Sequence, residues 1–125
     1  MRPIKISVLG TYEQLDNIRR KIEEEYGVSS LSPVYIKNIG MLPVTAETEI
    51  EGRRVPLNIW LVTTEPEYRS VREEYVKGSK GIVVCATGKR EEIELPDDVP
   101  VSFYRGGGIR EVLDSLASAY TSQMK

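Results

Sequence analysis

The alternation of apolar and polar residues predicts a strand, a helix and a hairpin in the first half of the chain. Residues 4–10 alternate and then run apolar to a glycine, which is typical of a buried strand. Residues 11–27 have apolar side chains at helical spacing, a T-x-x-Q capping box at the start and a glycine at the end, so they predict a helix. Residues 44–62 alternate on both sides of a Glu-Gly-Arg turn and predict a hairpin. Residues 29–43 lack a period and contain two prolines and a glycine, so we expect a loop there.

The second half of the chain predicts two more helices and two more strands. A T-x-x-E capping sequence opens residues 64–78, which predict a helix that ends at a glycine. Residues 81–86 are a short apolar run typical of a strand buried on both faces, and residues 99–104 predict a further strand. Residues 106–120 begin with three glycines and continue with apolar residues at helical spacing. In the helix of residues 64–78, the side chains expected to point inward or half-inward are Tyr68, Val71, Tyr75 and Val76.

The order of these elements indicates the fold class. Strands and helices alternate and include one antiparallel hairpin, which predicts an α/β three-layer sandwich with a mostly parallel sheet of about five strands. The chain has 125 residues, enough for one core and too few for two, so we expect a single domain over residues 1–125.

Composition narrows the chemistry that the chain can perform. The net charge is −2 with both signs interspersed, which favours neither nucleic acid nor a membrane surface as a partner. Histidine is absent and Cys85 is the one cysteine, so Ser-His and Cys-His catalysis, disulfide frameworks and most zinc sites are excluded. The remaining Glu and Tyr residues show no catalytic spacing. We therefore expect no enzymatic activity, no metal and no cofactor. No signal peptide or spanning segment is visible, so we expect a cytoplasmic protein.

The element order and the residues of one long segment resemble the Ras-like small GTPases, in particular the Rab type. Residues 38–86 align without a gap, through the turn "EGRRV", the strand ending "IW", the helix "EYRSVREEY" and the strand "KGSKGIVV". The resemblance implies a Ras-like domain over most of the chain. After residue 86 the chain is shorter than the family pattern by one strand and one or two helices. This shortening implies a truncated domain with five strands, and it removes the region that builds the family's guanine pocket.

The phosphate-binding loop of the family, G-x-x-x-x-G-K-[ST], is degenerate here. Gly10 matches its first glycine, but Leu15, Asp16 and Asn17 stand where the second glycine, the lysine and the Ser/Thr belong. Asp16 would repel each phosphate charge by roughly 4 kcal/mol at about 4 Å and an effective dielectric of 20. Alternatively, Asp16 is a solvated residue near the positive end of the helix. Both readings predict that no nucleotide binds at this loop.

The other nucleotide motifs of the family have also lost their functional residues. Asn38 aligns with the magnesium-binding threonine, Leu61 with the aspartate of D-T-A-G-Q, and Thr64 with its glycine. Lys89 and Glu91 are relics of the guanine motif N-K-x-D or belong to a charged surface loop. The pattern predicts a domain that neither binds nor hydrolyses GTP and is stable when empty. We expect apolar residues such as Leu15 and Met41 to fill the vacated region.

The resemblance also implies a partner-binding surface. Trp60 and Tyr75 align with aromatic residues of the family's partner-binding surface, and an outward tryptophan beside a tyrosine is typical of a binding hot spot. Alternatively, a helix of the protein itself covers Trp60, and the predicted loop of residues 29–43 folds inward and fills the space that a nucleotide would occupy. The implied partner is another G-domain protein, a roadblock- or longin-type protein, or a second copy of the chain. The residues predicted to form this surface are Trp60, Tyr68, Tyr75, Ile39, Met41 and Leu42.

A second hypothesis concerns the sequence "YRGGGIR". Gly106, Gly107 and Gly108 precede a helix between Arg105 and Arg110, and backbone N–H groups at a helix start favour anions. This pattern predicts a sensor of small phosphorylated or carboxylate ligands, or else only a flexible turn between a strand and a helix. An atypical, weak GTP-binding protein is a further alternative.

Overall fold

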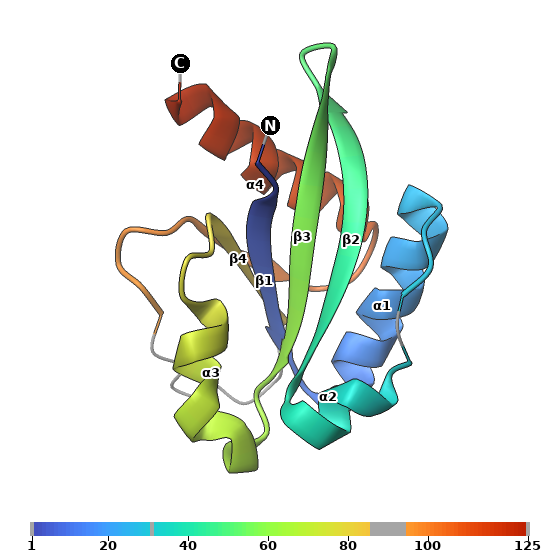
Figure 1. The fold of residues 1–125 in the computed structure, drawn as a ribbon, viewed down its shortest axis with the longest axis vertical. Coiled ribbons are helices and arrows are strands. Elements are labelled where there is room, and N and C mark those ends of the chain that lie inside the picture. Colours follow the sequence, from blue (N-terminus) through green and yellow to red (C-terminus); the bar gives the residue numbers. More distant parts are fainter. Residues whose placement is uncertain (1, 31, 86–94, 125) are drawn as a thin grey trace.

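The computed structural model describes residues 2–30, 32–85 and 95–124. Figure 1 shows its elements around one twisted sheet. In chain order they are β1 (Ile4–Gly10), α1 (Tyr12–Tyr26), α2 (Val34–Ile39), β2 (Met41–Ile50), β3 (Arg53–Thr63), a 3₁₀ turn (Pro66–Tyr68), α3 (Arg69–Val76), β4 (Gly81–Cys85), β5 (Val101–Tyr104) and α4 (Ile109–Gln123).

The strands form one five-stranded mixed sheet in the order β2-β3-β1-β4-β5. Only β2 and β3 pair in antiparallel orientation, and the other neighbours are parallel. The predicted α/β class, the five strands and the single antiparallel hairpin are therefore confirmed.

Two hydrophobic cores lie on opposite faces of this sheet. Ile4, Ile6 and Val8 of β1 belong to a core that also contains the buried residues of α1 and α4. Leu9 at the end of β1 belongs to a second core with Val76 of α3. Since neighbouring residues of a strand point to opposite faces, α1 and α4 cover one face and α3 covers the other, as Figure 1 shows. None of the helices in the described part of the chain is long and apolar enough to cross a membrane.

Helix α1 begins and ends where the sequence predicts. Thr11 Oγ1 accepts a hydrogen bond from Gln14 N at 3.2 Å, and Thr11 N donates to Gln14 Oε1 at 2.9 Å, which together form the capping box. Gly27 ends the helix in the left-handed conformation with φ of 67°.

The hairpin also has the predicted facing pairs, with Val44 opposite Ile59 and Ala46 opposite Leu57. Its turn consists of Glu51 and Gly52, both with positive φ, which is the geometry of a type I′ turn.

The predicted loop of residues 29–43 is wrong in its second half. Residues Val34–Ile39 form helix α2, and β2 already begins at Met41. Pro33 and Gly40, which suggested a loop, are instead the two ends of this short helix. Only Ile36 is buried in it, so no apolar period marks the helix.

The start of the next helix also differs from the prediction. Thr64 does not cap it; its backbone N–H donates to Gly10 O at 2.8 Å and extends the pairing of β1 with β3. A 3₁₀ turn precedes α3, and the guanidinium of Arg72 donates to the carbonyls of Thr63 and Glu65. Val76 is buried as expected, whereas Val71 is 37% exposed, which is more than the inward or half-inward position expected of it.

Candidate functional site

The connection from β1 to α1 occupies the place that the resemblance assigns to a phosphate-binding loop. Thr11 alone separates the two elements, and α1 runs from Tyr12. Leu15 N donates to Thr11 O at 2.9 Å, and each later N–H in a helix donates to the carbonyl four residues before it. The N–H groups of Leu15, Asp16 and Asn17 therefore serve the helix and cannot cradle a phosphate.

Side chains of the protein fill the space beside Gly10. A Cβ added at Gly10 would lie 3.1 Å from Gln14 Oε1 and 3.2 Å from Cys85 Sγ. Leu15 is fully buried in the core shared by α1 and α4. Met41 is buried too, but in the core under α3 on the opposite face, so the expectation that Leu15 and Met41 fill one vacated region is wrong.

The other residues aligned with nucleotide motifs differ in their surroundings: one is in ion pairs, two are buried and two are exposed. Asp16 forms ion pairs with Arg19 at 2.9 Å and with Arg20 at 3.1 Å. Leu61 in β3 and Thr64 directly after it are buried, whereas Asn17 and Asn38 are exposed. The residues aligned with the guanine motif, Lys89 and Glu91, lie outside the described residues.

Two tyrosines, one in the 3₁₀ turn and one in α3, hold α2 in place. The Tyr68 hydroxyl donates to Lys37 O, and the Tyr75 hydroxyl donates to Ile39 O at 2.6 Å. These carbonyls belong to the last turn of α2, where no helical N–H satisfies them. Gly40 follows with φ of 83°, and an added Cβ there would lie 2.7 Å from the Tyr68 ring. These contacts tie the end of α2 to the 3₁₀ turn through Tyr68 and to the last turn of α3 through Tyr75.

Exposed apolar side chains gather on these two helices. Val34, Tyr35 and Ile39 of α2 are 49%, 43% and 44% exposed, and Val71 of α3 is 37% exposed. Val71 lies one helical turn before Tyr75, whose hydroxyl reaches the end of α2. We call Val34, Tyr35, Ile39 and Val71 the α2–α3 surface. The two other exposed large apolar side chains in the described part of the chain, Phe103 and Met124, are 64% and 70% exposed.

A hollow of about 500 Å³ adjoins this surface between the first turns of α1 and α2. Val34, Ile36 and Pro33 give it apolar walls, and Tyr12 and Asp16 lie on the side of α1. The Tyr12 hydroxyl donates to Glu67, and the Asp16 carboxylate is paired with Arg19 and Arg20.

Trp60 lies half-buried on the α3 face of the sheet. The Lys5 ammonium lies 3.8 Å from its ring centroid, and the Tyr75 ring lies 6.3 Å away. The indole Nε1 is buried and has no hydrogen-bond partner among the described residues. Burial lowers the pKa of Lys5, whose Nζ also donates to Lys77 O at 2.7 Å.

The structure therefore divides the residues predicted to bind a partner. Met41 and Leu42 are buried, so they are not part of the surface as it stands here. Tyr68 and Tyr75 are half-buried with bonded hydroxyls, and Ile39 is exposed. Sequence reasoning missed Tyr35 and the exposure of Val71, because it treated α2 as a loop and placed Val71 inward or half-inward.

The start of α4, predicted as an anion site, already holds a carboxylate of the protein. Ile109 N and Arg110 N donate to the two oxygens of Glu25, at 3.2 Å each. The Arg110 guanidinium donates to Glu25 O at 2.9 Å and to Asp114 Oδ2 at 3.4 Å. Arg105, Gly106, Gly107 and Gly108 are exposed around this contact. The N–H groups expected to bind an external anion are thus occupied.

Cys85 is the one cysteine of the chain and a candidate nucleophile. Its side chain is buried at the end of β4, and burial raises the pKa of the thiol to about 11. The thiol is therefore protonated near neutral pH, and a protonated thiol is a poor nucleophile.

Comparison with known proteins adds no relative to this description. No protein-family model matches the chain, and no curated protein matches it.

Proposed function

We propose that the protein is a non-catalytic interaction module with the outline of a Ras-like small GTPase, and that it works by binding another protein. The sequence similarity of residues 38–86 and the order of the elements support the first part of this proposal. By analogy with the family, the partner is a G-domain protein, a roadblock- or longin-type protein, or a second copy of the chain.

The observation that carries the binding role is the α2–α3 surface. Four of the six exposed large apolar side chains in the described part of the chain lie on these two short helices. Contiguous exposed apolar side chains mark interaction sites, because leaving them in water costs free energy. Tyr68 and Tyr75 hold the two helices together, so the surface is preformed and binding would order little of the chain.

The β1–α1 connection supports the absence of nucleotide binding. A P-loop offers backbone N–H groups, a lysine and a hydroxyl to the phosphates and to magnesium. Here the aligned positions lie in a helix whose N–H groups are used internally, and Asp16 carries the wrong charge. An anion sensor at the glycine turn is less well supported, because Glu25 already binds the helix start.

The proposal is tested by removing apolar contacts from the α2–α3 surface. We expect the double variant Tyr35→Ser, Ile39→Ser to fold like the wild type, because both side chains are exposed and only the Ile39 backbone bonds to Tyr75. Removing anchor residues from an interface typically costs about 2 kcal/mol or more, so bound partners or self-association should fall at least about tenfold. The measurements are sedimentation for self-association and affinity capture from cells with quantitative mass spectrometry.

Phe103→Ser is the matched control, because Phe103 is 64% exposed on β5, at the sheet edge opposite β2. It should leave every captured partner and the oligomeric state unchanged. Equal capture and equal self-association by the wild type and the double variant would contradict the proposed role of the α2–α3 surface.

A further inference from the structure

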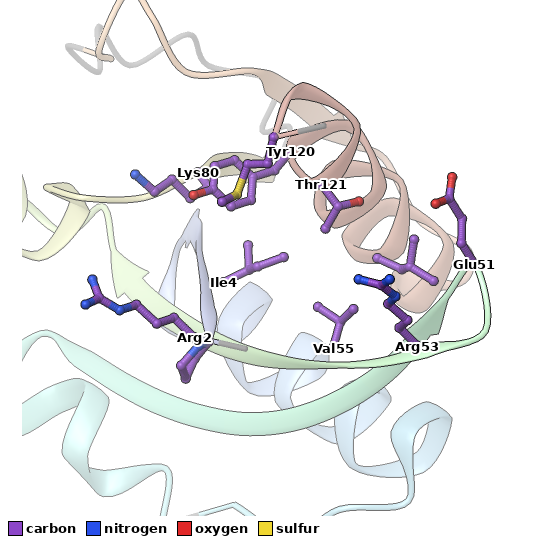
Figure 2. A pocket seen from close by; sticks show the side chains of 11 residues that line it. Arg2, Ile4, Glu51, Arg53, Val55, Lys80, Tyr120 and Thr121 are labelled. Carbon is purple, nitrogen blue, oxygen red and sulfur yellow. The ribbon is translucent and has the colours of Figure 1, made fainter.

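A second concave region lies at the other end of the sheet from α2 and α3. Figure 2 shows a cavity of about 840 Å³ between the start of β1, the tip of the β2–β3 hairpin and the end of α4. In Figure 1 the hairpin tip and the end of α4 lie at the top, whereas α2 and α3 lie at the bottom. The volume falls in the usual range for sites that bind small organic molecules, about 300–1,000 Å³.

The cavity is positively charged in a chain that is negative overall. Arg2, Arg53 and Lys80 line it and Glu51 is its one acidic residue, so the lining carries three positive charges against one negative charge. The whole chain has a net charge of −2. None of the three cations forms an ion pair with a carboxylate among the described residues, whereas Arg19, Arg20 and Arg110 elsewhere do.

The rest of the lining is mostly apolar. Ile4 and Val55 form a floor that continues the core, and Ile50, Tyr120 and Met124 stand around it. In Figure 2, Ile4 and Val55 lie in the middle, with Arg2 and Lys80 toward one end and Arg53 and Glu51 toward the other. The Lys80 ammonium lies 5.5 Å from the Tyr120 ring centroid, so this cation borders the apolar part.

We propose that this cavity binds a small organic anion with an extended apolar body, such as an aliphatic carboxylate. The anionic group lies between Arg2 and Lys80, away from the Glu51 carboxylate, and the apolar body covers Ile4 and Val55 toward α4. Two cations without a carboxylate partner favour the charge, and the apolar floor favours the body. This site does not depend on the proposed protein-binding role of the α2–α3 surface.

The test is a titration of the full chain followed by backbone amide NMR shifts, with decanoate as the probe. Decanoate should give saturable shifts at Ile4, Val55 and Lys80 and should leave Tyr35 and Ile39 unmoved. Decyltrimethylammonium has the same chain with the opposite charge, and inorganic phosphate has charge without a chain; neither should saturate these shifts. Added salt should weaken decanoate binding, because the cations lie at the surface.

Substitutions locate the anionic group. The double variant Arg2→Gln, Lys80→Gln should weaken decanoate binding by about fivefold or more, as expected for two exposed charge contacts. Lys77→Gln is the matched control, because Lys77 is an exposed lysine three residues away that does not line the cavity. The proposal is overturned by an absence of saturable decanoate shifts at the cavity, by equal binding of either comparison compound, or by unchanged affinity in the double variant.

Discussion

At the scale of single residues, Leu15 is where the chain departs from the phosphate-binding pattern that it resembles. The resemblance aligns it with a glycine that would let backbone approach a phosphate, yet here it is a fully buried core residue of α1. A glycine at this position would have no side chain to bury in the core and would therefore contribute little to the free energy of unfolding. In this chain the leucine contributes to the packing of α1 against the sheet.

Leu15→Ala should therefore destabilise the empty protein strongly. Removing a buried leucine side chain typically costs about 2–5 kcal/mol, because apolar burial is lost and a cavity remains. Asn17→Ala, an exposed change two residues along the same helix, should alter the free energy of unfolding by less than about 0.5 kcal/mol. Urea unfolding followed by circular dichroism measures both. Equal midpoints for the two variants would show that Leu15 does not pack the core.

At the scale of elements, the glycine turn at the start of α4 resembles a site for an external anion, but it binds a carboxylate of the protein itself. Three glycines lead into a helix whose first N–H groups bind the Glu25 carboxylate. A carboxylate at this position interacts favourably with the positive end of the helix dipole. The contact also joins the end of α1 to the start of α4 on one face of the sheet.

Glu25→Ala should lower the stability by about 1 kcal/mol, a typical cost of losing a helix N-terminal cap. It should also open the helix start, so that phosphate at constant ionic strength raises the melting temperature of the variant and not of the wild type. Glu24→Ala is the control, because Glu24 is exposed in the same turn and bonds to no residue of α4. Equal stabilisation of the wild type by phosphate would mean that the turn binds anions as it is.

The elements also differ in how far the sequence predicts them. The boundaries of α1 were predicted correctly, because its capping box and its terminal glycine are local interactions. Helix α2 was missed, because six residues with one buried side chain leave no periodic pattern. The T-x-x-E sequence at Thr64 was misread as a cap, because the Thr64 N–H bonds instead to Gly10 O on another strand.

At the scale of the whole molecule, the architecture followed from hydrophobic periodicity and the candidate surfaces did not. Alternating residues on β2 and β3 determine which face is buried, so the hairpin and the fold class could be predicted. The α2–α3 surface depends on Tyr68 and Tyr75 reaching carbonyls 31 and 36 residues away. The contact of Glu25 with the start of α4 could not be predicted for the same reason, since Glu25 is 84 residues from Ile109.

The whole molecule also separates its two candidate surfaces. The α2–α3 surface lies at one end of the sheet, and the cationic cavity lies at the other (Figure 1). The packed β1–α1 connection, which the resemblance aligns with a nucleotide-binding loop, lies at the same end of the sheet as the α2–α3 surface. The proposed function therefore requires that the protein be folded and able to bind its partner without a nucleotide.

The most direct measurement is a titration of the purified chain with a fluorescent GTP analogue in the presence of magnesium. With the N–H groups of residues 15–17 inside α1 and Asp16 paired with two arginines, we expect no saturable binding at micromolar concentrations. We also expect no guanine nucleotide in the protein as purified. Saturable, magnesium-dependent binding, or GDP that co-purifies in amounts comparable to the protein, would contradict this account.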